Sequence, residues 1–88
     1  MLEITLYSRT VCQQCRATKR KLEKEGLGDF VREINVEHDE AAAQFLRDAG
    51  YTEAPVVITS WGDEWTGFRP DLVEALRDRV KAEAEAAE

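Results

Sequence analysis

The only two cysteines of this 88-residue chain, Cys12 and Cys15, are three positions apart. Two thiols at this spacing can form a disulfide, exchange with the disulfide of another molecule, or supply two ligands to a metal. In a reducing compartment, such a pair is more typical of redox chemistry or metal binding than of a structural disulfide. The pair therefore indicates thiol–disulfide exchange as the first hypothesis.

A metal-binding module is the alternative from another functional class. A structural zinc site needs four ligands, and the two cysteines together with the single histidine, His38, leave it one short. A copper carrier usually has a methionine just ahead of its first cysteine, whereas residues 9–11 here are Arg-Thr-Val. A metal site shared between two copies of the chain stays open.

The cysteines lie where a predicted strand passes into a predicted helix. Residues 2–7 alternate apolar and polar side chains, which predicts a half-buried strand, and residues 8–11 form a turn. The segment 13–25 contains neither glycine nor proline and is followed by Gly26, so we expect a helix there. This junction of strand and helix is typical of a redox Cys-x-x-Cys motif.

The two cysteines are expected to have different roles. Cys12, at or just before the first helical turn, would lie near unpaired backbone N–H groups and the positive end of the helix, which favour its thiolate form. Cys15 lies one turn later and faces inward with Thr18 and Leu22. We predict Cys12 as the nucleophile and Cys15 as the resolving thiol.

The rest of the chain predicts an α/β domain over residues 1–80. Further strands are expected at 30–36, 56–59 and 64–66. A second helix would begin after His38 or Asp39 and end at Gly50, with an apolar face formed by Ala41, Ala42, Phe45, Leu46 and Ala49. A third would begin near Pro70. The order β-α-β-α-β-β-α predicts a mixed sheet with helices packed on it. Residues 81–88 form an acidic tail that we expect to fray.

Charge and composition limit the partners. The net charge of −6 argues against a nucleic acid as partner. No apolar run approaches the roughly 20 residues of a membrane span, and residues 1–4 lack the features of a signal peptide. We therefore expect a cytoplasmic protein that binds neither nucleic acid nor a membrane. Nothing in the sequence demands a dimer, so a monomer is expected.

Positive charge is concentrated around the cysteines. Half of the 12 lysines and arginines lie between residues 9 and 24, against the single acid Glu23. Two interpretations are open: a solvated helix face, or a positive field that favours the thiolate and attracts an acidic partner segment. The cations are Arg9, Arg16, Lys19, Arg20, Lys21 and Lys24.

Two motifs resemble those of the NrdH-redoxins, glutaredoxin-like members of the thioredoxin superfamily. The first begins at Cys12 and continues through Gln13, Gln14, Cys15, Arg16, Ala17, Thr18 and Lys19. The second is Trp65, Thr66, Gly67, Phe68, Arg69 and Pro70. Residues 50–57, with Ala54-Pro55 ahead of the third strand, also fit. Thr10 and Gln13 depart from the family pattern, which often has proline and valine there.

The resemblance implies a thioredoxin/glutaredoxin-like fold, in which three helices flank a four-stranded mixed sheet. It implies a dithiol–disulfide oxidoreductase that binds no cofactor and uses NADPH indirectly, through thioredoxin reductase. The electrons would pass to the large subunit of class Ib ribonucleotide reductase. The implied partner-binding residues are Arg9, Val11, Gln13, Gln14, Lys19, Ala54, Pro55, Trp65, Thr66, Gly67, Phe68, Arg69 and Pro70.

Some features of the resemblance have alternatives. Pro55 would be cis and face the dithiol, leaving Ala54 free to pair with an extended substrate; the alternative is a trans proline that starts a strand. The side chains of residues 65–70 serve either packing or docking. A glutathione-dependent glutaredoxin is the nearest alternative function. Bulky Phe68 and Arg69 argue against it, because glutaredoxins have a glycine-rich, acid-capped loop there that holds a glutathione carboxylate.

Overall fold

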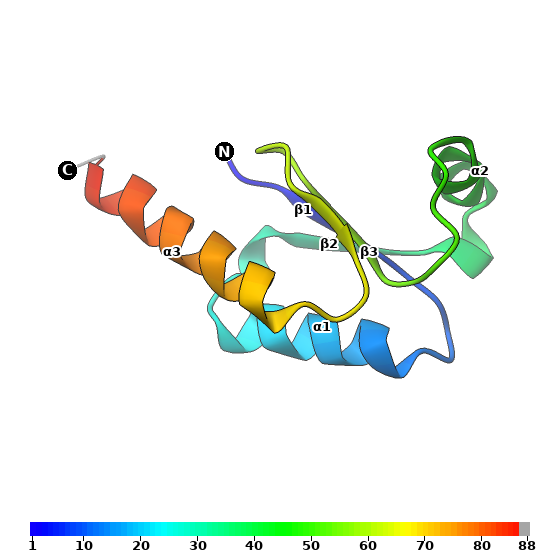
Figure 1. The fold of residues 1–88 in the computed structure, drawn as a ribbon, viewed down its shortest axis with the longest axis horizontal. Helices are drawn as coiled ribbons and strands as arrows, with labels where there is room; N and C mark the ends of the chain where they lie inside the picture. Colours follow the sequence, from blue (N-terminus) through cyan, green and yellow to red (C-terminus); the bar gives the residue numbers. More distant parts are fainter. Residues whose placement is uncertain (87–88) are drawn as a thin grey trace.

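The architecture is a four-stranded mixed sheet with helices on both faces (Figure 1). We describe residues 1–86 of a computed structural model. The strands, in the sheet order β2-β1-β3-β4, are β2 Val31–Asn35, β1 Ile4–Ser8, β3 Val56–Thr59 and β4 Glu64–Thr66. β1 is parallel to β2 and antiparallel to β3, which is antiparallel to β4. The predicted mixed sheet is confirmed.

Three helices connect and cover the strands. They are α1 Gln13–Lys24, α2 Glu40–Asp48 and α3 Pro70–Ala86. Two short 3-10 turns, η1 Gly28–Phe30 and η2 Val36–His38, precede β2 and α2. In Figure 1, α1 and α3 run side by side beneath the sheet and α2 lies on its other side. The predicted order β-α-β-α-β-β-α is therefore confirmed.

The main core lies between the sheet and the pair α1/α3. The alternating residues Ile4, Leu6 and Ser8 of β1 are fully buried, because side chains along a strand point to opposite faces by turns. The helices contribute Leu22 from α1 with Val73 and Leu76 from α3. This packing fixes the start of α1, and with it the two cysteines, at the end of β1.

Polar contacts also hold α1 against α3. The Glu25 carboxylate, just after α1, lies 2.6 Å from a guanidinium nitrogen of Arg77 on α3. Lys21 Nζ lies 2.8 Å from Glu25 and 2.7 Å from Glu74 of α3. Hydrogen bonds from Lys21 and then from Arg77 lower the pKa of Glu25 to about 2. These ion pairs couple the two helices beside their apolar contact.

Several details differ from the expected pattern. β1 begins at Ile4 and includes Ser8, although Leu2 is still buried. Phe45, predicted on the apolar face of α2, is 49% exposed and rests against Tyr7, with 6.0 Å between ring centroids. Sequence periodicity correctly placed Ala42 and Leu46 in the interior, but α2 packs only along that narrow line.

The C-terminal stretch is helical as far as it is described. α3 continues to Ala86, and the side chains of residues 81–86 are all exposed. The last two residues of the expected acidic tail, 87 and 88, lie outside the described part, and fraying of the tail stays a prediction. Within residues 1–86, no helix is both long enough and apolar enough to cross a membrane.

Candidate active site

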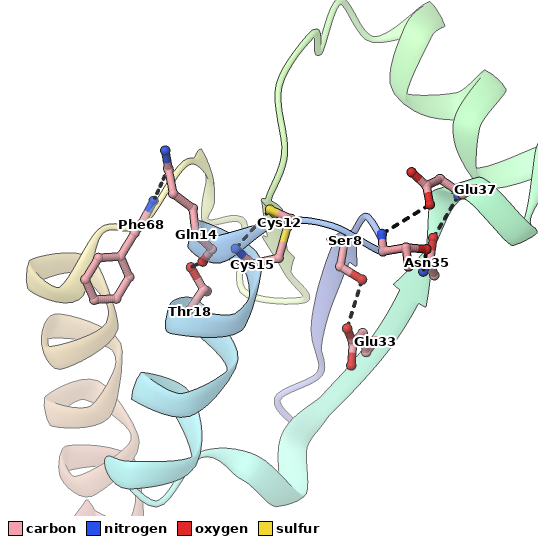
Figure 2. The surroundings of a disulfide bond; sticks show 10 residues. Ser8, Cys12, Gln14, Cys15, Thr18, Glu33, Asn35, Glu37 and Phe68 are labelled. Atoms are coloured by element: carbon pink, nitrogen blue, oxygen red, sulfur yellow. Dashed lines mark hydrogen bonds between the residues drawn. A yellow bond between two sulfur atoms is a disulfide. The ribbon is translucent and has the colours of Figure 1, made fainter.

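Cys12 and Cys15 form a disulfide at the N-terminus of α1 (Figure 2). Their Cα atoms are 5.2 Å apart, as expected for residues i and i+3 at the first turn of a helix. Cys12 is the N-cap residue, and its Sγ accepts a hydrogen bond from the Cys15 backbone N–H at 3.1 Å. The sulfur therefore occupies the position where a capping oxygen usually satisfies an unpaired helical N–H.

The two sulfurs differ in access. Cys15 is only 3% exposed, whereas Cys12 is partly exposed. A thiolate at Cys12 would keep the Cys15 N–H as a hydrogen-bond donor and would face the positive end of α1. The Cys12 thiolate can therefore reach and attack a disulfide of another molecule, while Cys15 reacts from within. This geometry fits the roles predicted for the two residues.

The turn before the dithiol is attached to the end of β2. The Thr10 backbone N–H donates to Glu37 Oε1 at 3.2 Å, and Thr10 Oγ1 accepts from Asn35 Nδ2 at 3.1 Å. Hydrogen bonds from Thr10 hold the pKa of Glu37 below its ordinary value. A proline at position 10 would have no N–H to donate, so the departure at Thr10 supplies an anchor that proline lacks.

A buried hydroxyl lies at the end of β1, beside the disulfide (Figure 2). Ser8 Oγ donates to Glu33 Oε2 at 2.8 Å, and Lys19 Nζ lies 3.0 Å from Glu33 Oε1. Lys19, followed by Ser8, lowers the pKa of Glu33. Sequence reasoning missed both Ser8 and Glu33; the alternation along β1, extended by one residue, would have placed Ser8 inside.

Two distant loops complete the site. The Ala54–Pro55 peptide bond is cis, as the resemblance implied, and Pro55 is buried. The Pro55 carbonyl accepts a hydrogen bond from the Gly67 N–H at 2.9 Å. Beside it, Gln14 Oε1 accepts from the Phe68 N–H at 3.1 Å. The first turn of α1, the proline loop and the loop between β4 and α3 thus meet around the dithiol.

A groove of about 410 Å³ opens next to the proline loop, between the sheet and α2. Arg9 and Ala54, two of the residues predicted to contact a partner, are among those that line it. Tyr7, Tyr51 and Val56 also contribute to its wall. A chain segment bound along Ala54 could therefore place side chains in this groove.

Comparison with known proteins identifies the family. The glutaredoxin family model matches residues 4–60. The glutaredoxin-like protein NrdH of Escherichia coli K12 is 47% identical over 76 residues, which is 85% of this chain and 89% of that protein. NrdH of Salmonella typhimurium LT2 is 43% identical with the same coverage.

A solved structure agrees with the sequence relatives. The NrdH-redoxin of Escherichia coli superposes with a TM-score of 0.77 at 43% identity, covering 84% of this chain and 93% of the other. This chain belongs to the NrdH-redoxins. It therefore has the thioredoxin/glutaredoxin fold and is a thiol–disulfide oxidoreductase, as the resemblance implied. A glutaredoxin from Archaeoglobus fulgidus, 21% identical with a TM-score of 0.65, shares the fold.

In this redoxin, the second family motif divides between packing and exposure. Trp65 is 8% exposed in the main core, and Thr66 pairs with Val56 of β3. Phe68, in contrast, is 39% exposed, so only Trp65 serves the packing role considered for both. Arg69 is held by Asp71 through contacts of 2.9 and 3.1 Å, and Pro70 begins α3.

The remaining predicted contact residues lie on the same end of the redoxin. Val11 is 89% exposed directly beside Cys12, and Gln13 is exposed in the first turn of α1. Lys19 is exposed one turn further on and paired with Glu33. Their contact with a partner stays a prediction. Trp61 folds back on the core, with the Arg79 guanidinium 5.2 Å from its ring centroid.

The described part of this redoxin contains no preformed metal site. Among residues 1–86, no three His, Cys, Asp or Glu side chains are grouped so that they could hold a metal ion. The single histidine, His38, is exposed in η2.

Proposed function

We propose that this redoxin is a dithiol reductase of protein disulfides, which takes electrons from NADPH through thioredoxin reductase and delivers them to class Ib ribonucleotide reductase. A cytoplasmic location accompanies this proposal, because the carrier must be reduced again after each turnover. The related NrdH-redoxin of Escherichia coli is described as having a thioredoxin-like activity profile, which supports the proposal.

The exchange would proceed in two steps. The Cys12 thiolate attacks one sulfur of the target disulfide, forming a mixed disulfide and releasing one target thiolate. The Cys15 thiol then loses its proton and attacks Cys12 Sγ, which forms the intramolecular disulfide and releases the second target thiolate. Two electrons pass to the target, and two protons complete its thiols. Thioredoxin reductase returns the two electrons from NADPH to the disulfide.

The observation that carries the choice of electron donor is the hydrogen bond from the Phe68 N–H to Gln14 Oε1, at 3.1 Å. In glutaredoxins, this loop holds a carboxylate of glutathione. Here the Phe68 N–H already has an acceptor, and the Arg69 guanidinium is occupied by Asp71. A glutathione carboxylate would have to displace both interactions, which favours a protein as the donor.

The test measures NADPH consumption with a model disulfide in two arms. One contains thioredoxin reductase, and the other contains glutathione with glutathione reductase. We expect turnover in the first arm only, and its loss in Cys15→Ser, because a mixed disulfide at Cys12 then has no resolving thiol. Turnover confined to the glutathione arm would overturn the assignment of the donor. A third measurement then follows electrons from reduced redoxin to ribonucleotide reductase, where failure to support deoxyribonucleotide formation would overturn the proposed acceptor.

Variants at Gln14 separate the donor hypothesis from general damage. Gln14→Ala frees the Phe68 N–H and should raise turnover in the glutathione arm above its starting level. Gln14→Glu keeps a side-chain oxygen as acceptor and should leave that arm silent. Equal behaviour of the two variants would show that this hydrogen bond does not control glutathione use.

A further inference from the structure

One face of α1 carries a row of cations that have no partner in the described chain. Arg16, Arg20 and Lys24, here called the basic row, are exposed and follow each other at intervals of four residues. No carboxylate of residues 1–86 forms a salt bridge with any of them. The neighbouring Lys19 and Lys21 are both paired, at 3.0 and 2.8 Å.

The absence of these pairs is notable in an acidic protein. The chain has 18 acidic residues against 12 lysines and arginines. Yet Glu23 is the single acid within α1, and no ion pair connects it to the basic row. A positive strip on an otherwise acidic molecule favours the approach of a negatively charged partner to that strip.

An apolar surface adjoins the basic row. The exposed ring of Phe68 and Ala17 line a shallow hollow of about 720 Å³. Its charged lining is three cations and one acid, Arg20, Lys21, Lys24 and Glu23. The hydrogen bond to Gln14 holds the Phe68 backbone against the first turn of α1 (Figure 2). The ring therefore lies on the same side of α1 as Arg20 and Lys24.

The dimensions fit a short peptide segment. From Arg16 to Lys24 the helix rises about 12 Å, at 1.5 Å per residue, which corresponds to about four residues of extended chain. A stable contact between two folded proteins covers about 800 Å² on each partner, far more than one helix face and one ring provide. The basic row begins at Arg16, one residue after Cys15, so a segment bound along it lies beside the reacting sulfurs.

We propose that the basic row and Phe68 bind an acidic peptide segment, bearing one apolar side chain, that flanks the disulfide of the electron acceptor. Its carboxylates lie along the basic row and its apolar side chain covers Phe68. This inference rests on the proposed disulfide-reductase function and adds the recognition of its target.

The experiment compares two synthetic peptides, each closed by one disulfide. The acidic peptide has aspartate and glutamate residues around one leucine next to the disulfide; the neutral peptide has asparagine and glutamine in their place. Reduction by pre-reduced redoxin is followed at low and high salt. Three exposed ion pairs, each contributing a factor of about two, should make kcat/KM about eightfold higher for the acidic peptide at low salt. The preference should disappear at high salt.

Charge-matched variants locate the site. Arg20→Glu replaces one of the three attractions by a repulsion and should reduce the preference for the acidic peptide from about eightfold to about twofold. Phe68→Ser should weaken the preference by raising KM for that peptide. Arg32→Glu makes the same change of charge on β2, at an exposed arginine that does not line the hollow and has no ion pair in residues 1–86. This variant should keep the preference. Equal losses in Arg20→Glu and Arg32→Glu would overturn the proposal in favour of a general charge effect.

Other outcomes separate this inference from the proposed function. Reduction of both peptides with equal kcat/KM would overturn the docking site and leave the reductase function standing. Reduction of neither peptide would overturn the function and the inference with it. A dimer of this acidic chain in sedimentation, dissolved by Arg20→Glu, would assign the basic row to a second copy and refute the peptide partner.

Discussion

Replacing Gly67 by alanine tests the contact that positions the loop beside the dithiol. Gly67 has a φ of +79°, and a Cβ placed there would lie 3.2 Å from Gln14 Oε1. The substitution therefore has two costs: a left-handed backbone carrying a side chain, and a shift of the Gln14 side chain that weakens its hydrogen bond with the Phe68 N–H. Gly26 provides a matched control, because its φ is +80° and nothing lies within 4 Å of the Cβ position.

The magnitudes follow from this comparison. A left-handed alanine costs roughly 1–2 kcal/mol at either position. The smaller conformational entropy of the unfolded chain acts equally in both variants and cancels. If the shift breaks the Gln14–Phe68 hydrogen bond, it adds roughly 0.5–1.5 kcal/mol for Gly67→Ala alone. For a domain of this size, the additional loss corresponds to a Tm lower by about 2–12 °C than that of Gly26→Ala.

The assay is urea unfolding of the oxidised protein with both single variants, Gln14→Ala, and the double variants. In the Gln14→Ala background, Gly67→Ala should destabilise the fold no more than Gly26→Ala does, because the contact is already absent. Equal losses for the two glycine variants in the unmodified background would refute the reasoning. The same result would remove the basis for treating the Gln14–Phe68 contact as the tether of the loop.

Three further predictions concern the scaffold of the site. Glu25 has a folded-state pKa of about 2 against an ordinary value of 4.5, so the stability that it contributes is present above pH 4.5 and lost as the pH falls toward 2. The difference in unfolding free energy between wild type and Glu25→Gln, measured in urea across this pH range, should therefore shrink on acidification. A difference independent of pH would contradict the ion pairs as its source. Leu22→Ala removes a fully buried side chain beneath α1 and should lower the free energy of unfolding by about 2–4 kcal/mol, whereas a loss below about 1 kcal/mol would mean that α1 packs elsewhere. Asp39→Ala removes the carboxylate that accepts the Ala42 N–H at 2.9 Å and should cost about 1 kcal/mol, with Asp39→Asn as the variant that keeps a capping oxygen and most of the stability.

Local sequence was sufficient for the reactive residues because their geometry is local. Cys12 and Cys15 are three residues apart at the start of a helix. Because a helix has 3.6 residues per turn, it brings residues i and i+3 close together whatever its sequence. The strand preceding them follows from alternation. The second helix follows from its two candidate capping residues, of which Asp39 is the N-cap in the structure. The Trp65–Pro70 motif extended this to the family, which the relatives confirm.

The contacts that surround the dithiol depended on the tertiary structure. Gln14 meets Phe68 across 54 positions and Glu25 meets Arg77 across 52, and neither pair has a periodicity that could reveal it. Such contacts are set by how α3 packs beside α1 on the sheet. Likewise, the exposure of Phe45 and Phe68 depends on whether another helix or strand packs over them. Their hydrophobicity favours burial but does not determine which element covers them. The sequence by itself determined where the chemistry lies; the packing of distant elements decided which groups around it are free to meet a partner.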